Sequence, residues 1–526
     1  MPEFDESQGW HPGHNPWAIA LTVTIATFME VMDTSIANVA LPHIAGGLST
    51  GMDEATWILT SYLVSNAIIL PISAWLSDRF GRKRFYMTCV ALFTVSSFMC
   101  GLSVSLPMLI FFRIMQGMGG GGLGPSEQAI LADTFPAAKR GMAFAVYGMA
   151  VVLAPAIGPT LGGWITDNYS WRWIFYVNIP FGVLSLFLSS FMVSDPPHMV
   201  RNQQEAKRNP VDFLGLVLVA TGLGALQVVL DKGQREDWFA SHFIIGFVIL
   251  SGCALVAFVF WEWNNKHPIV HLRLFQNRSF AVACLLMLVV FAALFGSTVL
   301  IPQFAQTEIG YTAQLAGELL SPGGFAIILI MPIVGRLVTR VDARYLIGFG
   351  LVISGLALFR MTNLFSGIDF RTLMWWRVFQ ALGVGFLFVP INTLSYNDMK
   401  PEQSNQISSM VNLMRNMGGS IGISFVTTMV IRRQQVHQDY LARHTYQYNP
   451  LLQQTLAAMT KLGSSRTNAA LAMKRAYGQI YGAMQQQAAV LAYIDVFWIM
   501  GGVCLLAIVI LFFAKKTKPG QAAMGH

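Results

Sequence analysis

Long apolar runs separated by short polar segments dominate the chain. A membrane-spanning helix needs about 20 mostly apolar residues, and fourteen runs meet that length. Their limits are 17–42, 56–76, 84–104, 107–131, 141–163, 172–194, 211–230, 240–263, 280–304, 315–338, 345–362, 372–395, 405–431 and 491–514. The pattern predicts fourteen membrane helices, and it is weakest at 315–338 and 405–431, where Glu318, Arg415 and several glycines interrupt the runs.

Positive charge in the short loops predicts the orientation, because Lys and Arg collect in cytoplasmic loops. If residues 1–16 are cytoplasmic, nineteen Lys and Arg residues lie in cytoplasmic loops and tails, and four in short outside loops. The reverse orientation would invert this ratio. We therefore expect cytoplasmic tails at 1–16 and 515–526. Residues 1–16 lack the basic start of a signal peptide.

One predicted outside segment, 432–490, is long, rich in glutamine and mixed in charge. Apolar residues recur within it at helical spacing, which predicts amphipathic helices. They form two series: Leu452, Leu456, Met459 and Leu462, then Met473, Tyr477, Ile480, Met484, Ala488 and Leu491. We expect a folded helical hairpin outside the membrane.

Several markers recur at a constant offset of 264 residues. The pairs are Asp78 and Asp342, Arg113 and Arg377, Gln116 and Gln380, Gly119 and Gly383, and Gly158 and Gly422. The offset predicts that the six helices of 17–194 are repeated in 280–514, with two additional helices in 195–279. Parallel six-helix repeats place a substrate site near the midplane, between the halves. Chance alignment of glycine-rich helices is the alternative.

The repeat also locates the chemistry, because Asp33 corresponds to Ser297. Only the first half keeps a carboxylate at this position, so we expect proton coupling there.

Composition supports a membrane protein, since 54% of the residues are apolar and only 11% are charged. Soluble proteins carry about 25% charged residues. The net charge of +8 comes largely from the short loops, so it indicates topology and not nucleic-acid binding. The sequence contains no P-loop, no HExxH motif and no paired cysteines. We therefore expect no enzyme activity, metal or cofactor, and an ion gradient as the energy source.

Four segments carry a family resemblance. AWLSDRFGRKR at 74–84 matches G-x-L-x-D-R-x-G-R-[KR], with Ala74 in place of the first glycine, and LIFFRIMQGMG at 109–119 matches L-x-x-x-R-x-x-Q-G-x-G. PAIGPTLGG at 155–163 matches the G-P-x-x-G-G antiporter motif, and DTSIANVALP at 33–42 matches D-x-T-I-V-N-V-A-L-P. Over 17–514 the chain resembles the major facilitator superfamily, its fourteen-span drug:proton antiporters and most closely the EmrB-type multidrug exporters.

The resemblance implies an all-α polytopic protein of the bacterial inner (cytoplasmic) membrane, with two six-helix bundles and two inserted helices. It implies proton-driven export of lipophilic compounds by alternating access. It further implies an EmrA-like periplasmic adaptor and an outer-membrane channel as partners, for which the hairpin 432–490 is the expected docking surface. A lid or stabilising cap is the alternative for the hairpin. A proton-coupled transporter of one native metabolite is the alternative function.

Asp33 and Arg113 are charged residues inside predicted membrane helices, where each must face protein or water. Burial favours the neutral form of a carboxyl group, and a nearby guanidinium favours the charged form. We predict that Asp33 carries the proton and Arg113 tunes it, with a fixed ion pair as the alternative. Glu30 lies one turn before Asp33 on the same helical face. It can bind a cationic substrate, share the proton or cap a polar pocket.

A second group of candidates lies in a cytoplasmic loop and its repeat counterpart. Carboxylate–guanidinium pairs there can latch helices in one state and release them in another. The latch candidates are Asp78, Arg79, Arg82, Lys83 and Asp342. Anchoring by positive charge alone is the alternative.

The antiporter motif comprises Pro155, Gly158, Pro159, Gly162 and Gly163. Its two prolines predict a bend, and its glycines predict close helix packing. In the resembling family the motif marks export.

Four further polar residues are candidates for substrate contact or gating: Glu127, Arg377, Asn412 and Arg415. A solvated helix end is the alternative for Glu127, and structural pairing between helices is the alternative for the other three.

Overall fold

The computed structural model describes residues 13–397, 399–446, 448–464 and 468–516, and every α or β element in these ranges is a helix. The first half contains α1 (Pro16–Gly47), α2 (Met52–Ala55), α3 (Trp57–Phe80), α4 (Arg82–Leu102), α5 (Leu106–Thr134), α6 (Ala137–Asn168), α7 (Trp173–Tyr176) and α8 (Asn178–Met192). A middle segment contains α9 (Pro197–Arg208), α10 (Phe213–Lys232) and α11 (His242–Asn264). The second half contains α12 (Arg278–Phe304), α13 (Ala313–Glu318), α14 (Ser321–Leu337), α15 (Ala343–Arg360), α16 (Phe370–Ser395), α17 (Ser404–His444), α18 (Pro450–Ser464) and α19 (Ala469–Leu511). Most of the predicted tails, 1–12 and 517–526, lie outside the described residues.

Short polar residues set several helix starts by satisfying free backbone amides. The Asn15 side chain accepts a hydrogen bond from the Trp17 amide before α1, at 2.9 Å. Asp212 accepts from the Gly215 amide before α10, at 2.8 Å. These caps fix where the loops end and the long apolar helices begin.

The predicted spans correspond closely to the observed helices. Among the described residues, eleven helices are long and apolar enough to cross a membrane, and counting the bent α6 as one span makes twelve. The spans predicted at 107–131 and 405–431 correspond to α5 and α17, which do not meet this test. Both helices place glycines and polar residues against neighbouring helices, so they need less apolar surface than a lipid-facing helix.

The 264-residue repeat is visible in the packing. In the first half α1 packs on α6, α3 on α5, and α4 on α5. In the second half the equivalent pairs are α12 on α17, α14 on α16, and α15 on α16. The two halves meet where α6 contacts α14 and α16 and where α17 contacts α3 and α5.

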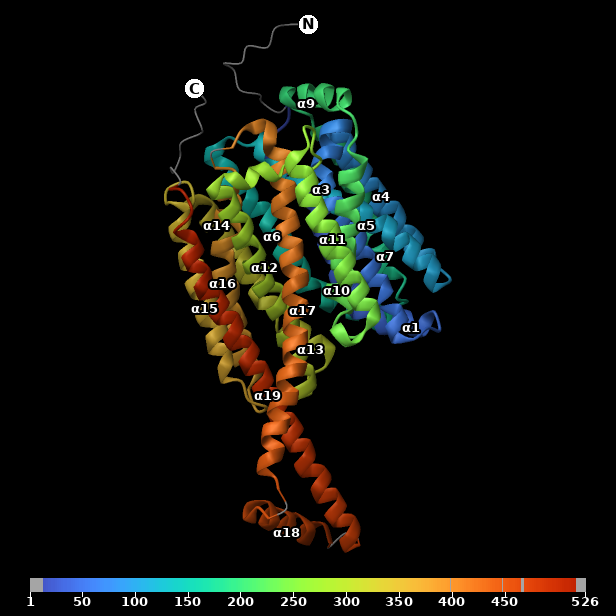
Figure 1. Cartoon of the computed structure of the whole chain (residues 1–526), viewed down its shortest axis with the longest axis vertical. Helices are drawn as coiled ribbons and strands as arrows, with labels where there is room; N and C mark the ends of the chain where they lie inside the picture. Colours follow the sequence, from blue (N-terminus) through green and yellow to red (C-terminus); the bar gives the residue numbers. More distant parts are fainter. Residues whose placement is uncertain (1–12, 398, 447, 465–467, 517–526) are drawn as a thin grey trace.

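The inserted helices α10 and α11 form a pair whose main bundle contact is between α10 and α3. The short helix α9 lies across one end of the bundle, which we call the α9 end (Figure 1). The end of α17, α18 and the start of α19 project from the opposite end, which we call the α18 end (Figure 1).

This projection is helical, as the spacing predicted. Met473 and Tyr477 belong to the apolar series but remain about half exposed, at 48% and 47%, whereas Ala472 and Ala476 are buried. The small alanines allow close helix contact at this point, and Met473 and Tyr477 stay on the outer surface.

Candidate transport site

The centre of the first half holds a buried ion pair. Arg113 on α5 donates from Nη1 to Oδ2 of Asp33 on α1 at 2.6 Å, and both side chains are buried. Gln116 and Asn178 donate their side-chain amides to the other Asp33 oxygen at 3.0 and 2.7 Å. Arg113 also donates to the Ile58 carbonyl and lies over the Tyr62 ring. The carboxylate therefore has three side-chain donors from two neighbouring helices, α5 and α8.

The second half repeats this geometry without the acid. Arg377 on α16 donates from Nη1 to the Ser297 hydroxyl at 3.0 Å and to Gln380 Oε1 at 2.7 Å. Gln380 donates to the same hydroxyl at 2.7 Å, as Gln116 does to Asp33. The predicted correspondence of Asp33 and Ser297 is confirmed as a correspondence of position.

A second acidic group lies near this pair. Glu30 on α1 accepts hydrogen bonds from Tyr62 Oη at 3.3 Å and from Asn66 Nδ2 at 3.2 Å. Glu127 on α5 accepts a hydrogen bond from the Thr27 hydroxyl of α1. The alternative that placed Glu127 at a solvated helix end is wrong, because its side chain is fully buried. α5 continues past it to Thr134, and most of its residues from Gln116 to that end are buried.

Two predicted residues of α17 connect the halves. Arg415 donates to the Tyr147 hydroxyl of α6 at 2.7 Å. Asn412 donates to Gln128 Oε1 of α5 at 2.9 Å and accepts from Tyr147 at 3.3 Å. Pairing between helices, the alternative for these residues, is therefore present, and it crosses the contact between the two halves.

The latch candidates gather at the α9 end. Asp78 accepts a hydrogen bond from Asn405 of α17 at 2.6 Å, so its observed partner is an amide of the other half. Arg82 pairs with Asp133 of its own half at 2.7 Å, and Ser404 of α17 donates to that carboxylate at 2.8 Å. The halves are thus joined at this end through two carboxylates.

The other latch candidates stay within their own half or reach the middle segment. Arg79 donates to the carbonyl groups of Ala206 and Asn209 at 2.9 and 3.3 Å. Lys83 donates to the Ser190 carbonyl at 2.6 Å. Asp342 caps α15 and pairs with Arg344 at 3.0 Å. The described contacts of these three residues therefore do not join the two halves.

The antiporter motif bends α6, as predicted: the segments 138–155 and 157–168 are inclined at 41°. Pro155 and Pro159 both lie inside the helix. A Cβ atom on Gly158 would lie 2.5 Å from Ser35 of α1, and one on Gly162 would lie 3.0 Å from Ile36. The predicted close packing at these two glycines is confirmed. Gly163 has no atom within 4 Å of a Cβ position, so packing does not explain it.

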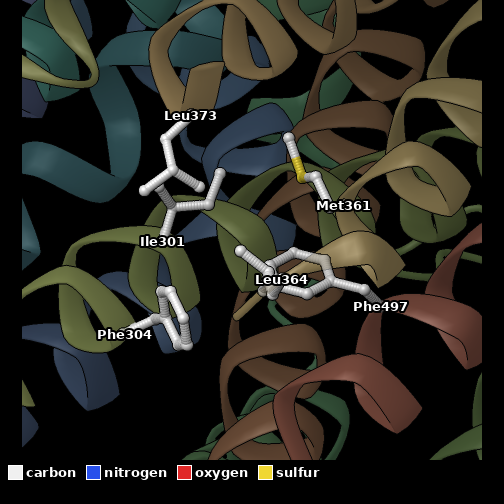
Figure 2. Close-up of a pocket in the computed structure, with 6 residues that line it drawn as sticks. All are labelled: Ile301, Phe304, Met361, Leu364, Leu373 and Phe497. Carbon is white, nitrogen blue, oxygen red and sulfur yellow. The ribbon is translucent and has the colours of Figure 1, made fainter. Parts of the chain in front are cut away.

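Two small cavities among the described helices bear on the position of a substrate site. One, shown in Figure 2, lies inside the second half and has only apolar walls: Ile301, Phe304, Met361, Leu364, Leu373 and Phe497. The other lies between α6 of the first half and α12, α14 and α16 of the second, with Arg377 in its wall. Only the second cavity touches both halves and a charged group, so it fits the predicted location of a substrate site.

Several important partners were missed by the sequence reasoning. Gln116 could have been found, because it belongs to the repeated R-x-x-Q-x-x-G pattern, but the pattern served only to detect the repeat. Asn178, Tyr147 and Asn405 gave no local signal. Asp133 lies just beyond a predicted span and resembles an ordinary loop charge in the sequence.

Comparisons with known proteins agree with this architecture. A family model described as Major Facilitator Superfamily matches residues 23–423. The multidrug export protein EmrB of Escherichia coli (strain K12) is 35% identical over 498 residues, which are 94% of this chain and 95% of that protein. The fatty acid resistance protein FarB of Neisseria gonorrhoeae is 34% identical over 508 residues, or 97% of each chain.

Among solved structures, the proton:xylose symporter XylE bound to 6-bromo-6-deoxy-D-glucose aligns with a TM-score of 0.60 at 14% identity. The alignment covers 96% of this chain and 97% of that one. This likeness confirms the predicted all-helical polytopic fold. The superfamily match and the near full-length relatives identify the chain as a multi-pass membrane transporter, not an enzyme, that belongs to the major facilitator superfamily and to its EmrB-like multidrug exporter family.

Proposed function

We propose that this transporter exports lipophilic compounds in exchange for protons, by alternating access, from the bacterial inner membrane. In this proposal residues 17–194 and 280–514 move as two bundles, and 195–279 links them. The tails 1–16 and 515–526, and with them the α9 end, face the cytoplasm. Relatives named for multidrug export and for fatty acid resistance support lipophilic substrates.

The observation that carries the proposal is the buried Asp33–Arg113 pair. A charge held inside a membrane bundle is costly and usually functional. Asp33 has three donors, so loss of its charge would leave Arg113 without a counter-ion while Gln116 and Asn178 still hold the carboxyl group in place. A proton arriving at Asp33 therefore weakens one specific contact between α1 and α5. Glu30, one turn away, is a second group that can share the proton.

The contacts between the halves support alternating access. At the α9 end, Asn405 and Ser404 of α17 bind Asp78 and Asp133 of the first half. Opening toward that end requires these hydrogen bonds to break. We assign the conformational latch to this set, assisted by Arg79, Arg82, Lys83 and, in the second half, Asp342.

Proton release from the purified protein tests the coupling. Adding a lipophilic substrate to the wild type in weakly buffered detergent solution should release protons. Asp33→Asn should abolish this release while substrate still binds. The matched control is Asp369→Asn, an exposed helix cap before α16. Release that persists in Asp33→Asn would exclude Asp33 as the proton carrier.

The projecting hairpin supports a partner outside the membrane. Leu451, Leu462 and Tyr440 expose 72%, 77% and 61% of their surface. Large exposed apolar side chains on a domain that projects from the bundle favour an interaction surface. We assign this surface to an EmrA-like periplasmic adaptor that leads to an outer-membrane channel.

Two variants test the adaptor. Replacing 440–485 with a short Gly-Ser linker should abolish efflux across two membranes and spare transport in inside-out vesicles. Leu462→Glu should weaken adaptor capture, whereas Gln454→Glu, which adds the same charge to an exposed polar site on α18, should not. Loss of vesicle transport in the deletion variant would instead indicate a structural cap.

Export of one native metabolite is the second candidate function. A panel of chemically unrelated lipophilic compounds separates the two. Proton release by several of them supports multidrug export, and release by one alone supports the single-substrate transporter.

A further inference from the structure

Arg377 is a buried guanidinium whose observed partners are all neutral. It donates to the hydroxyl groups of Ser297 and Thr298 at 3.0 and 2.8 Å, and to Gln380 Oε1 at 2.7 Å. Its Nε is buried and makes no hydrogen bond to the described residues. No carboxylate of the described chain lies within salt-bridge distance of Arg377, which is only 6% exposed.

The first half shows what such a site normally contains. At the position related by the repeat, Arg113 has Asp33 as its counter-ion at 2.6 Å. Arginine cannot release its proton in a protein, so Arg377 cannot become neutral to relieve its burial. A buried charge without a partner is strongly unfavourable. The second repeat thus retains the cation and the glutamine in the same arrangement, and a neutral hydroxyl stands where the first repeat has its anion.

Arg377 also lies in the wall of the cavity between the halves. The cavity has a volume of about 20 Å³, enough for about one water molecule in this conformation. Its other walls are mostly apolar and include Val151 and Pro155 of α6 and Leu294, Phe295 and Ile327 of the second half. Because α6 belongs to the first half, movement of the halves apart would widen the cavity beside the guanidinium.

We propose that Arg377 binds the carboxylate of a lipophilic organic acid, whose hydrocarbon part occupies the apolar cavity between α6 and the second half. This rests on the proposed export function and names one substrate class for its central site. A guanidinium forms strong, charge-assisted hydrogen bonds with a carboxylate. The ligand supplies the negative charge that Asp33 supplies in the first repeat.

Equilibrium binding tests the assignment without a proton gradient, so it is independent of proton coupling. The probes are 11-(dansylamino)undecanoate and its methyl ester, added to the purified full-length protein in phosphatidylcholine nanodiscs. Hydrogen bonds to a charged group favour the acid by about tenfold or more. Wild type should therefore bind the acid at least about tenfold more tightly than the ester. Equal affinities would overturn the proposal.

Two variants link the preference to Arg377. Arg377→Gln should bind acid and ester equally. Ser297→Asp should do the same while keeping Arg377, because it installs the counter-ion that the first repeat has at Asp33. If Arg377→Gln does not fold, the acid preference of Ser297→Asp alone tests the assignment. An acid preference that survives Ser297→Asp would refute the assignment.

A membrane lipid is the other possible source of an anion. Adding phosphatidylglycerol to the nanodiscs should leave the affinity for the acid unchanged. Displacement of the probe by this lipid would mean that the site holds lipid phosphate, and the proposal would fail. Asp33→Asn should retain the acid preference, so a failure of proton coupling and a failure of this site give different results.

Discussion

Replacing Asp33 with asparagine should destabilise the protein more than replacing its partner Arg113 with glutamine. In Asp33→Asn the guanidinium stays charged and buried, because arginine does not deprotonate. The carboxylate offers two acceptor oxygens to the donors Arg113, Gln116 and Asn178. The amide of the variant offers only one. Breaking a buried ion pair from one side costs about 3–5 kcal/mol. Since a factor of ten corresponds to about 1.4 kcal/mol, the equilibrium constant for folding should decrease by roughly two to three and a half powers of ten.

Arg113→Gln is milder because the remaining carboxyl group can take up a proton and still accept from Gln116 and Asn178. The double variant Asp33→Asn with Arg113→Gln carries no buried charge at this point, so it should recover most of the loss. The measurement is the free energy of unfolding in mixed detergent micelles, followed by tryptophan fluorescence. The reasoning is refuted if Asp33→Asn is as stable as Arg113→Gln, or if the double variant is less stable than Asp33→Asn.

Two further predictions concern packing and the latch. Gly158→Ala places a Cβ atom 2.5 Å from α1, so unfolding should become easier by about 1–3 kcal/mol, whereas Gly163→Ala, with no atom within 4 Å, should leave unfolding unchanged or slightly harder. Asn405→Ala removes a 2.6 Å hydrogen bond to the Asp78 carboxylate, which should shift the free-energy difference between closed and open states by about 1.5–3 kcal/mol toward the open state. Distances between spin labels across the α9 end should then show a larger open population. Asn264→Ala, whose amide donates only within its own helix, should leave those distances unchanged, and an identical shift in both variants would count against the latch.

Local patterns were sufficient for much of the architecture. Apolar run length predicted the long helices, because a lipid-spanning helix must be apolar over a fixed length. The constant offset between Arg113 and Arg377 predicted a repeat that the packing of both halves now displays. Charged residues in apolar runs identified Asp33 and Arg113, because a charge at that depth requires a partner. The orientation and the functional roles of these residues remain predictions.

Which side chains meet across the bundle was decided only by the tertiary structure. Glu127 looked like a solvated helix end, but it is buried and accepts a hydrogen bond from Thr27 of α1, because α5 continues as a buried helix to Thr134. Asn178 completes the Asp33 site from a helix 145 residues away, and nothing in its local sequence marks it. Hydropathy distinguishes a segment that lies in the membrane from one that lies in water. It does not distinguish a side chain that faces lipid from one that faces another helix. The sequence by itself therefore determined which segments are long and apolar enough to cross a membrane. Packing between distant helices determined which polar groups pair, and among the described residues it left Arg377 without an acid.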